Sequence, residues 1–145
     1  MNKFTNKIVA FALLSFPFLG SAQTTYVTTS TTTRVAVVEE FTGNYCTFCP
    51  LGHKNLKELS DQYPGEILPI KIQYGGFSNP DPIFGGSLST PHGNSIAQQH
   101  AASAYPNIKV NRQGSAVEGA TKSEWEAAIT PIIAQNSPVN IYAEA

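Results

Sequence analysis

The sequence has little cysteine and little charge. Its 145 residues include two cysteines, one methionine and one tryptophan, and charged residues make up only 13% of the chain. The formal net charge is −1, which gives no net attraction to a polyanion, so we expect no nucleic acid among the partners. Hydrophobic residues make up 41%. This composition is typical of one globular domain with a core and excludes a tail or a linker.

Long hydrophobic runs are also scarce. The run over residues 8–19 is too short for an ordinary membrane-spanning helix. It follows Lys3 and Lys7 and precedes the small residues Gly20-Ser21-Ala22, which is the layout of a secretory signal. We predict a signal peptide over residues 1–22, with an uncleaved anchor as the alternative. Because no cysteine follows the cut, a lipoprotein is not expected. Export would place the chain in the periplasm, at the outer membrane or outside the cell.

The remaining chain divides by composition. Residues 23–33 are almost all Thr and Ser and predict an extended tether with too little apolar surface to fold. Residues 34–136 carry the hydrophobic patterns of one domain. Residues 137–145 alternate apolar and polar positions, which predicts a strand-like tail that is compatible with the start of a further domain.

The first half of the domain predicts two strands joined by a helix. Val35-Ala36-Val37-Val38 is a continuous β-branched run typical of a strand covered on both faces, and residues 67–73 form a second strand pattern. Between them an amphipathic helix ends at Pro64-Gly65, with Leu51, Leu56, Leu59 and Tyr63 on its apolar side. This order implies a right-handed parallel crossover.

The second half predicts an insertion, two helices and a strand pair. Residues 74–94 lack periodicity and predict a surface insertion, and residues 95–104 regain a helical pattern. A strand over residues 107–112 would pair with residues 115–117. Thr121 and Glu124 form a capping box that opens the last helix, and Pro131 should kink or shorten it. The residues of that helix expected to face the sheet are Trp125, Ile129, Ile132 and Ile133. We therefore predict an α/β fold with a central mixed sheet flanked by helices.

The two cysteines, Cys46 and Cys49, are separated by two residues and follow the first strand. This spacing is typical of a redox dithiol. A structural staple is an alternative, but so small a loop restrains the unfolded chain little. A zinc site is another alternative that would need His53 with His92 or His100, although structural zinc sites usually add a second close ligand pair.

The position of each cysteine predicts its role. A sulfur at the start of a helix is stabilised as a thiolate by unpaired amide groups and by the helix dipole. We therefore expect Cys46 to be the nucleophile. Cys49, one turn further and more buried, would resolve the mixed disulfide by attacking Cys46. Pro50 follows in the first turn, where a missing N–H costs least.

These residues resemble the thioredoxin-like superfamily, and the resemblance extends from Val35 to Gln135. A Tyr-Cys-x-x-Cys stretch follows a strand, Glu40 stands six residues before Cys46, and Tyr105-Pro106 precedes the strand pair and the last helix. In that superfamily the carboxylate moves protons for the resolving cysteine and the proline is cis beside the dithiol. The resemblance therefore implies a thioredoxin-like fold and a catalytic role for Glu40.

The chain is also similar to a secreted thioredoxin-like family of Bacteroidota described as outer-membrane-protein-related. The shared features are the run Glu39-Glu40-Phe41-Thr42-Gly43 and a Pro-x-x-x-x-Asn-Arg element at Pro106 and Asn111-Arg112. That family is usually longer, with a sandwich-like domain after the redox domain. Its activity is inferred largely from the motif, so the similarity supports fold and location more than substrate.

The surroundings of Glu40 and Pro106 in the sequence suit the roles that the resemblance implies for them. An apolar strand around Glu40 would raise its pKa by desolvation, which suits a group that exchanges protons near neutral pH. A solvated Glu40 is the alternative. Alternation sends Glu39 to the other face, where we expect it to be exposed. A cis Tyr105–Pro106 bond would present the Tyr105 backbone to a bound peptide, and a trans turn is the alternative.

The predicted function is an exported thiol–disulfide oxidoreductase acting on protein thiols or disulfides of the cell envelope, with an upstream thiol–disulfide partner that recharges the dithiol. Tyr45, Phe48, Tyr105 and Pro106 are the expected substrate-binding residues. We expect no metal and no cofactor besides the redox-active disulfide. The alternative is a non-catalytic binding module with a structural disulfide. His100 is expected to be a core residue, while His53 borders the apolar side of its helix.

Overall fold

The computed structural model describes residue 27, residues 30–79 and residues 85–141. The predicted signal peptide lies outside the described residues, as does part of the predicted tether. Every helix and strand of the described residues belongs to one compact unit.

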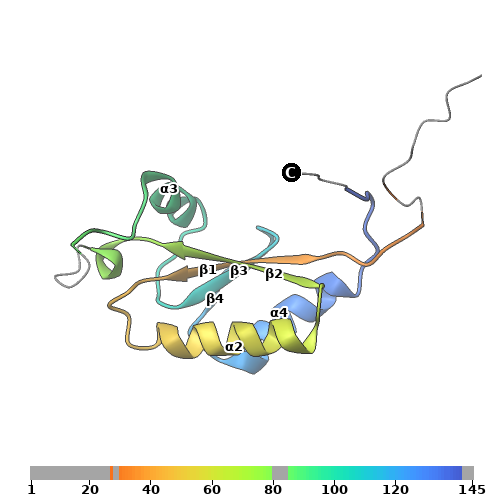
Figure 1. Ribbon diagram of the computed structural model, residues 1–145, viewed down its shortest axis with the longest axis horizontal. Coiled ribbons are helices and arrows are strands. Elements are labelled where there is room, and N and C mark those ends of the chain that lie inside the picture. Colours follow the sequence, from red (N-terminus) through yellow and green to blue (C-terminus); the bar gives the residue numbers. More distant parts are fainter. Residues whose placement is uncertain (1–26, 28–29, 80–84, 142–145) are drawn as a thin grey trace, which may run out of the picture. The chain divides into compact units, whose positions relative to one another are not determined.

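The centre of this unit is a four-stranded mixed sheet in the order β2-β1-β3-β4 (Figure 1). Strand β1 (Ala36–Thr42) pairs in parallel with β2 (Ile67–Gln73) and antiparallel with β3 (Asn107–Val110). The short strand β4 (Val117–Glu118) is antiparallel to β3. The predicted parallel crossover and the predicted mixed sheet are both confirmed. Strand β1 continues four residues beyond the apolar run that predicted it, through both glutamates.

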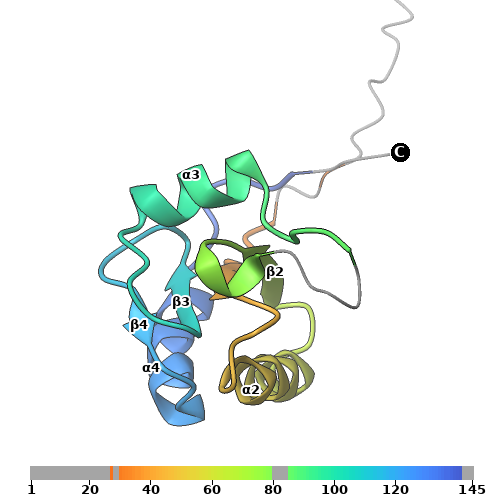
Figure 2. The ribbon, with the colours of Figure 1, turned by 90° about the vertical axis from the view of Figure 1, so that its left-hand side faces the viewer.

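Two helices cover one face of the sheet, as Figures 1 and 2 show. They are α2 (Cys49–Gln62) and α4 (Lys122–Ile133). Their apolar sides and the facing strand residues form the main core, whose buried members include Val38, Leu56, Leu59, Ile108, Trp125 and Ile129. The four apolar residues predicted to turn toward the sheet from α4 are all buried. Leu51, predicted on the apolar side of α2, is instead about half exposed.

The opposite face carries the shorter helix α3 (Pro91–Gln99) (Figure 2). A second core cluster lies under it and consists of Phe41, Ile72, Tyr74 and Ala97. The single turn η1 (Gly76–Ser78) follows β2 within the predicted insertion. Residues 80–84 of that insertion lie outside the described residues.

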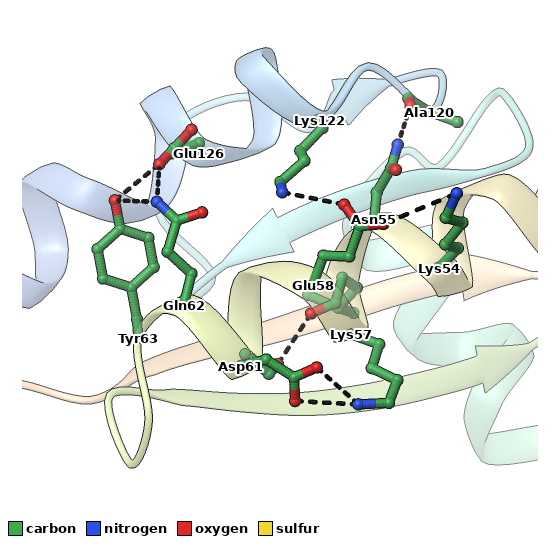
Figure 3. Close-up of polar contacts among 12 residues, drawn as sticks. Lys54, Asn55, Lys57, Glu58, Asp61, Gln62, Tyr63, Ala120, Lys122 and Glu126 are labelled. Atoms are coloured by element: carbon green, nitrogen blue, oxygen red, sulfur yellow. Dashed lines mark hydrogen bonds and ion pairs between the residues drawn. The ribbon is translucent and has the colours of Figure 1, made fainter.

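Polar side chains join α2 to α4 along their outer sides (Figure 3). The Lys122 ammonium group lies 3.0 Å from Glu58, and Glu126 accepts hydrogen bonds from Gln62 and Tyr63 at 2.7 Å each. Exposed pairs of this kind contribute little stability individually. The helices are therefore held mainly by their buried apolar sides.

Helix α3 begins earlier and ends earlier than the sequence pattern predicted. It spans Pro91–Gln99 rather than residues 95–104. Thr90 is its N-cap, because its hydroxyl oxygen accepts a hydrogen bond of 2.9 Å from the Gly93 N–H, and Pro91 occupies the first helical position. The Thr-Pro start signal outweighed the lack of apolar periodicity in residues 91–94.

The prediction that side chains cap the start of α4 is wrong. Thr121 is the N-cap residue, but its side chain makes no capping hydrogen bond. The Thr121 carbonyl oxygen instead accepts backbone hydrogen bonds from Glu124 and Trp125. Pro131 lies inside the helix, which continues only to Ile133.

The tail differs from its prediction as far as it is described. Residues 137–141 form no strand, and Val139 and Ile141 are exposed; residues 142–145 lie outside the described part. One isolated bridge joins Thr33 to Asn136. Among the described helices, none has the length and the apolar composition needed to cross a bilayer.

Candidate redox site

The two cysteines are joined in a disulfide where β1 leads into α2. The sulfur atoms are 2.12 Å apart and the Cα atoms 5.4 Å apart. Helix α2 starts at Cys49 itself, so Cys46 lies in the turn just before the helix rather than in its first turn. Cys49 is fully buried and the exposed fraction of Cys46 is 6%. The disulfide therefore joins the turn after β1 to the first residue of α2.

A glycine allows the turn before Cys46 to pack against η1. A Cβ atom added at Gly43 would lie 2.5 Å from the Cβ atom of Phe77, a distance that no real side chain tolerates. The Tyr45 N–H donates a hydrogen bond of 3.0 Å to the Phe77 carbonyl oxygen, and the Cys46 N–H donates one of 3.1 Å to the Gly43 carbonyl oxygen. The segment after β2 therefore holds the cysteine turn in place.

Glu40 lies on β1 beneath α2 and is completely buried. Neither of its carboxylate oxygens has a hydrogen-bond partner among the described residues. Burial raises its pKa from 4.5 to about 7, and the positive charge of Lys71 opposes the rise. The carboxyl group can therefore hold or release a proton near neutral pH.

The His53 side chain lies beside that carboxyl group. Its Nε2 atom lies 3.5 Å from Glu40 Oε1, beyond a good hydrogen bond, and 3.0 Å from Thr42 Oγ1. Burial lowers the pKa of His53, and the charge of Lys71 lowers it further. The sequence indicated only that His53 borders the apolar side of the helix; the contact with Glu40 depends on the packing of α2 over β1.

The backbone before β3 closes the site from the other side. The Tyr105–Pro106 peptide bond is cis, and Pro106 is fully buried. The Tyr105 ring stacks on the Tyr74 ring with centroids 4.5 Å apart and meets the edge of Phe77 at 4.8 Å. Its hydroxyl donates to the Tyr74 carbonyl oxygen at 2.9 Å. The Tyr105 side chain is thus held in place by its neighbours.

Aromatic side chains are exposed around the disulfide. Phe48, between the cysteines, has an exposed fraction of 67%, and Tyr45 and Phe77 are each nearly half exposed. Tyr45 and Phe48 were expected at this surface from the sequence. Phe77 was not, because it lies in an insertion without periodicity, and no local signal identifies it.

The expectation that Glu39 is exposed is wrong. Its side chain does point to the opposite face from Glu40, but its exposed fraction is 4%. The Arg112 guanidinium group donates to both of its oxygens, at 2.7 and 3.2 Å, and His100 Nε2 lies 3.4 Å away. His100 is largely buried, as expected, with its ring 6.0 Å from that of Phe41. An ion pair on the α3 face compensates the burial of Glu39.

A pocket of about 450 Å³ lies on that same face and is lined in part by Val35, Glu39, Arg112 and Val139. Neither cysteine nor Glu40 lines this pocket, and the Glu39 side chain that does points away from Glu40, so the pocket lies on the opposite side of the sheet from the redox site. Within the described part of the chain, no three His, Cys, Asp or Glu side chains come together in an arrangement that could hold a metal ion.

Comparison with known proteins identifies the architecture. No family model matches the sequence, and no curated protein matches it. A thioredoxin from Malassezia sympodialis matches with a TM-score of 0.50 and 23% identity over 71% of this chain and 79% of that one. A protein from Agrobacterium tumefaciens matches with a TM-score of 0.51 and 18% identity over 68% of this chain and 45% of that one. The fold is thioredoxin-like. Identities this low show a shared fold and leave activity to the chemistry of the site.

Within this thioredoxin-like fold, Gly52 brings the parts of the site together. A Cβ atom at Gly52 would lie 2.9 Å from Pro106 Cγ and 3.0 Å from both Glu40 Oε1 and Trp125 Cη2. Only a residue without a side chain lets α2 approach so closely. Because Cys49 is three residues earlier on the same side of the helix, Glu40 and Pro106 lie under the helix face that carries the second cysteine.

Proposed function

We propose that this protein is an exported thiol–disulfide oxidoreductase that works through the Cys46–Cys49 pair. The observation that carries the proposal is a disulfide at the start of a helix above a buried carboxyl group whose pKa is raised to about 7. An uncompensated buried carboxyl group costs stability. A disulfide with a purely structural role would gain nothing from such a group. Dithiol exchange does need one, since a proton must leave one thiol and later return.

In the proposed reaction, Cys46 is the nucleophile. Its thiolate attacks a disulfide of the partner protein, forms the Cys46–partner bond and expels one partner thiolate. Cys49 then attacks the Cys46 sulfur, re-forming the Cys46–Cys49 bond and releasing the second partner thiolate. Two electrons pass from the protein to the partner, and the reverse sequence oxidises a partner dithiol. Glu40 accepts the proton of the Cys49 thiol as it attacks.

The proposed substrates are proteins of the cell envelope, and a separate thiol–disulfide partner recharges the dithiol. Tyr45 and Phe48 would contact an apolar stretch of the substrate, while the Tyr105 backbone next to Pro106 would pair with it as an added strand. Export rests on the signal pattern of residues 1–22. The similarity to the secreted Bacteroidota family, carried by Glu39 to Gly43 and by Asn111-Arg112, points to the same location.

A trapping experiment tests the activity. In the mature domain, a Cys49→Ser variant should retain mixed disulfides with envelope proteins that disappear on reduction, and Cys46→Ser is the matched control that should trap none. The wild-type domain should also reduce insulin with a dithiol supply. The reduction potential of the domain then gives the direction of electron transfer. A potential well below about −200 mV favours a reductase, and a potential well above it favours an oxidase.

One observation favours a second candidate, a binding module with a structural disulfide. Both cysteines are nearly inaccessible in the oxidised chain, with Cys46 only 6% exposed, and attack on a disulfide requires access to a sulfur atom. If Cys49→Ser traps no protein and insulin is not reduced, the binding module is the correct function.

A further inference from the structure

The buried carboxyl group of Glu40 needs a route for protons. It is completely buried and has no hydrogen-bond partner among the described residues. If it takes a proton from a thiol in each cycle, that proton must reach water before the next cycle. A group that touches the carboxyl group and also reaches solvent would provide the route.

His53 satisfies both requirements. Its Nε2 atom is 3.5 Å from Glu40 Oε1, and its side chain is 33% exposed whereas Glu40 is not exposed at all. Thr42 Oγ1, 3.0 Å from the same nitrogen, holds the ring in this orientation. His53 lies on α2 one turn after Cys49, so the ring lies between the carboxyl group and the surface beside the cysteine helix.

We propose that His53 is the proton relay between Glu40 and solvent. This role rests on the proposed dithiol function. When Cys49 attacks Cys46, Glu40 takes the thiol proton. Glu40 then passes a proton to His53 Nε2, and the ring releases one from Nδ1 to water. The departing partner thiolate takes its own proton from solvent, so protons and electrons balance. His53 acts through Glu40 and is a positioning and relay residue rather than a catalytic one.

The electrostatic surroundings suit this exchange. The ionisable groups facing His53 are Glu40 from β1 and Lys71 from β2, while Trp125 of α4 and Pro106 bring only apolar atoms to the same region, at Gly52. Burial raises the pKa of Glu40 to about 7, so its carboxyl group exchanges a proton near neutral pH, and burial lowers the pKa of His53, so its ring gives up a proton to water more readily than an exposed histidine does.

The relay can be tested with the oxidised domain and a small dithiol, without a physiological substrate. Reduction by dithiothreitol and reoxidation by its cyclic disulfide would be followed by rapid alkylation and mass spectrometry between pH 6 and 9. His53→Gln keeps a polar contact for Thr42 but cannot titrate, and His53→Ala leaves space for free imidazole. His92→Ala, on the exposed start of α3, is the matched control.

We expect both His53 variants to reoxidise about 10-fold more slowly than wild type at pH 7 and at the same rate at pH 9, where hydroxide removes the proton. Added imidazole should restore His53→Ala but not His53→Gln, and His92→Ala should match wild type. A slowdown that is equal at every pH and insensitive to imidazole would assign His53 a purely structural role and overturn the proposal. Unchanged rates would overturn it as well.

A second measurement separates this proposal from the proposed function. Carbon-13 NMR of the Glu40 carboxyl group in the oxidised protein reports proton exchange with no thiol chemistry. Wild type should show one averaged signal through the titration, whereas His53→Gln should show broadening or two signals. Fast exchange in His53→Gln refutes the relay even if trapping succeeds. If the wild-type signal is averaged, the His53→Gln signal is broadened and no partner is trapped, the proposed oxidoreductase function is refuted while proton exchange through His53 stands.

Discussion

The buried Glu40 should make the protein less stable as the pH rises, and this can be measured against Glu40→Gln. The folded chain holds the Glu40 proton up to about pH 7, whereas the unfolded chain releases it near 4.5. Between these values the folded state binds more protons, so its free energy of unfolding falls with increasing pH. A difference of 2.5 between the two pKa values corresponds to about 3 kcal/mol. The loss is complete above pH 7 and absent below pH 4.5.

The assay is urea unfolding of the oxidised domain at pH 4, 5, 6, 7 and 8. Trp125 is the only tryptophan of the chain and is fully buried, so its fluorescence reports unfolding of the core. The lowered pKa of His53 acts in the opposite sense, but His53 is present in both proteins and its contribution largely cancels in their difference.

The expected result is a stability difference between Glu40→Gln and wild type that shifts by about 3 kcal/mol in favour of the variant from pH 4 to pH 8. A constant offset from burying an amide does not affect this shift. Glu124→Gln, at an exposed carboxylate of α4, is the control and should show no comparable shift. Parallel pH profiles for Glu40→Gln and wild type would refute the raised pKa and, with it, the proton-carrying role.

Three further substitutions test the packing around the site and the fold, each by urea unfolding at pH 7. Gly52→Ala should lower the free energy of unfolding by about 1–3 kcal/mol, because the added methyl group would overlap its neighbours. Gly86→Ala, which has open space around it, is the control and should be close to neutral. Equal effects of the two substitutions would contradict the close approach of α2 to Glu40 and Pro106. Thr90→Ala should cost about 1 kcal/mol through loss of its cap bond, and Thr121→Ala, which lacks one, should cost less. Arg112→Ala should cost about 2 kcal/mol by leaving a buried carboxylate without its main partner; no change would show that this carboxylate needs no compensation.

Local patterns were enough to predict the elements around the dithiol. The apolar run at Val35, the amphipathic helix and the run over residues 67–73 predicted a parallel crossover, which the pairing of β1 with β2 confirms. Such patterns depend on short-range periodicity and on turn residues, both of which are present in the sequence. The mixed sheet followed from the order of these elements along the chain, whereas the thioredoxin-like class was implied by the resemblance that the cysteine stretch, Glu40 and Tyr105-Pro106 carry.

What the sequence could not show are contacts between segments far apart in the chain. Phe77 holds the turn before Cys46, although the insertion that carries it has no regular pattern. Helix α3 starts four residues before the predicted position, because Thr90 and Pro91 begin the helix where apolar periodicity is absent. The Thr121 side chain makes no cap hydrogen bond, because the residue types of a capping box do not ensure the geometry that it needs.

The two adjacent glutamates show most clearly why a sequence alone leaves the site incomplete. Alternation sends Glu39 and Glu40 to opposite faces of β1, and both faces are buried at this point. Arg112 lies just beyond β3 and compensates Glu39, whereas Glu40 has no hydrogen-bond partner among the described residues and His53 Nε2 is 3.5 Å from its Oε1 atom. A fold selected for stability alone would place a partner or an apolar residue at the second position. The glutamate without such a partner is the one under the cysteine helix, which is where the proposed dithiol reaction needs a proton acceptor.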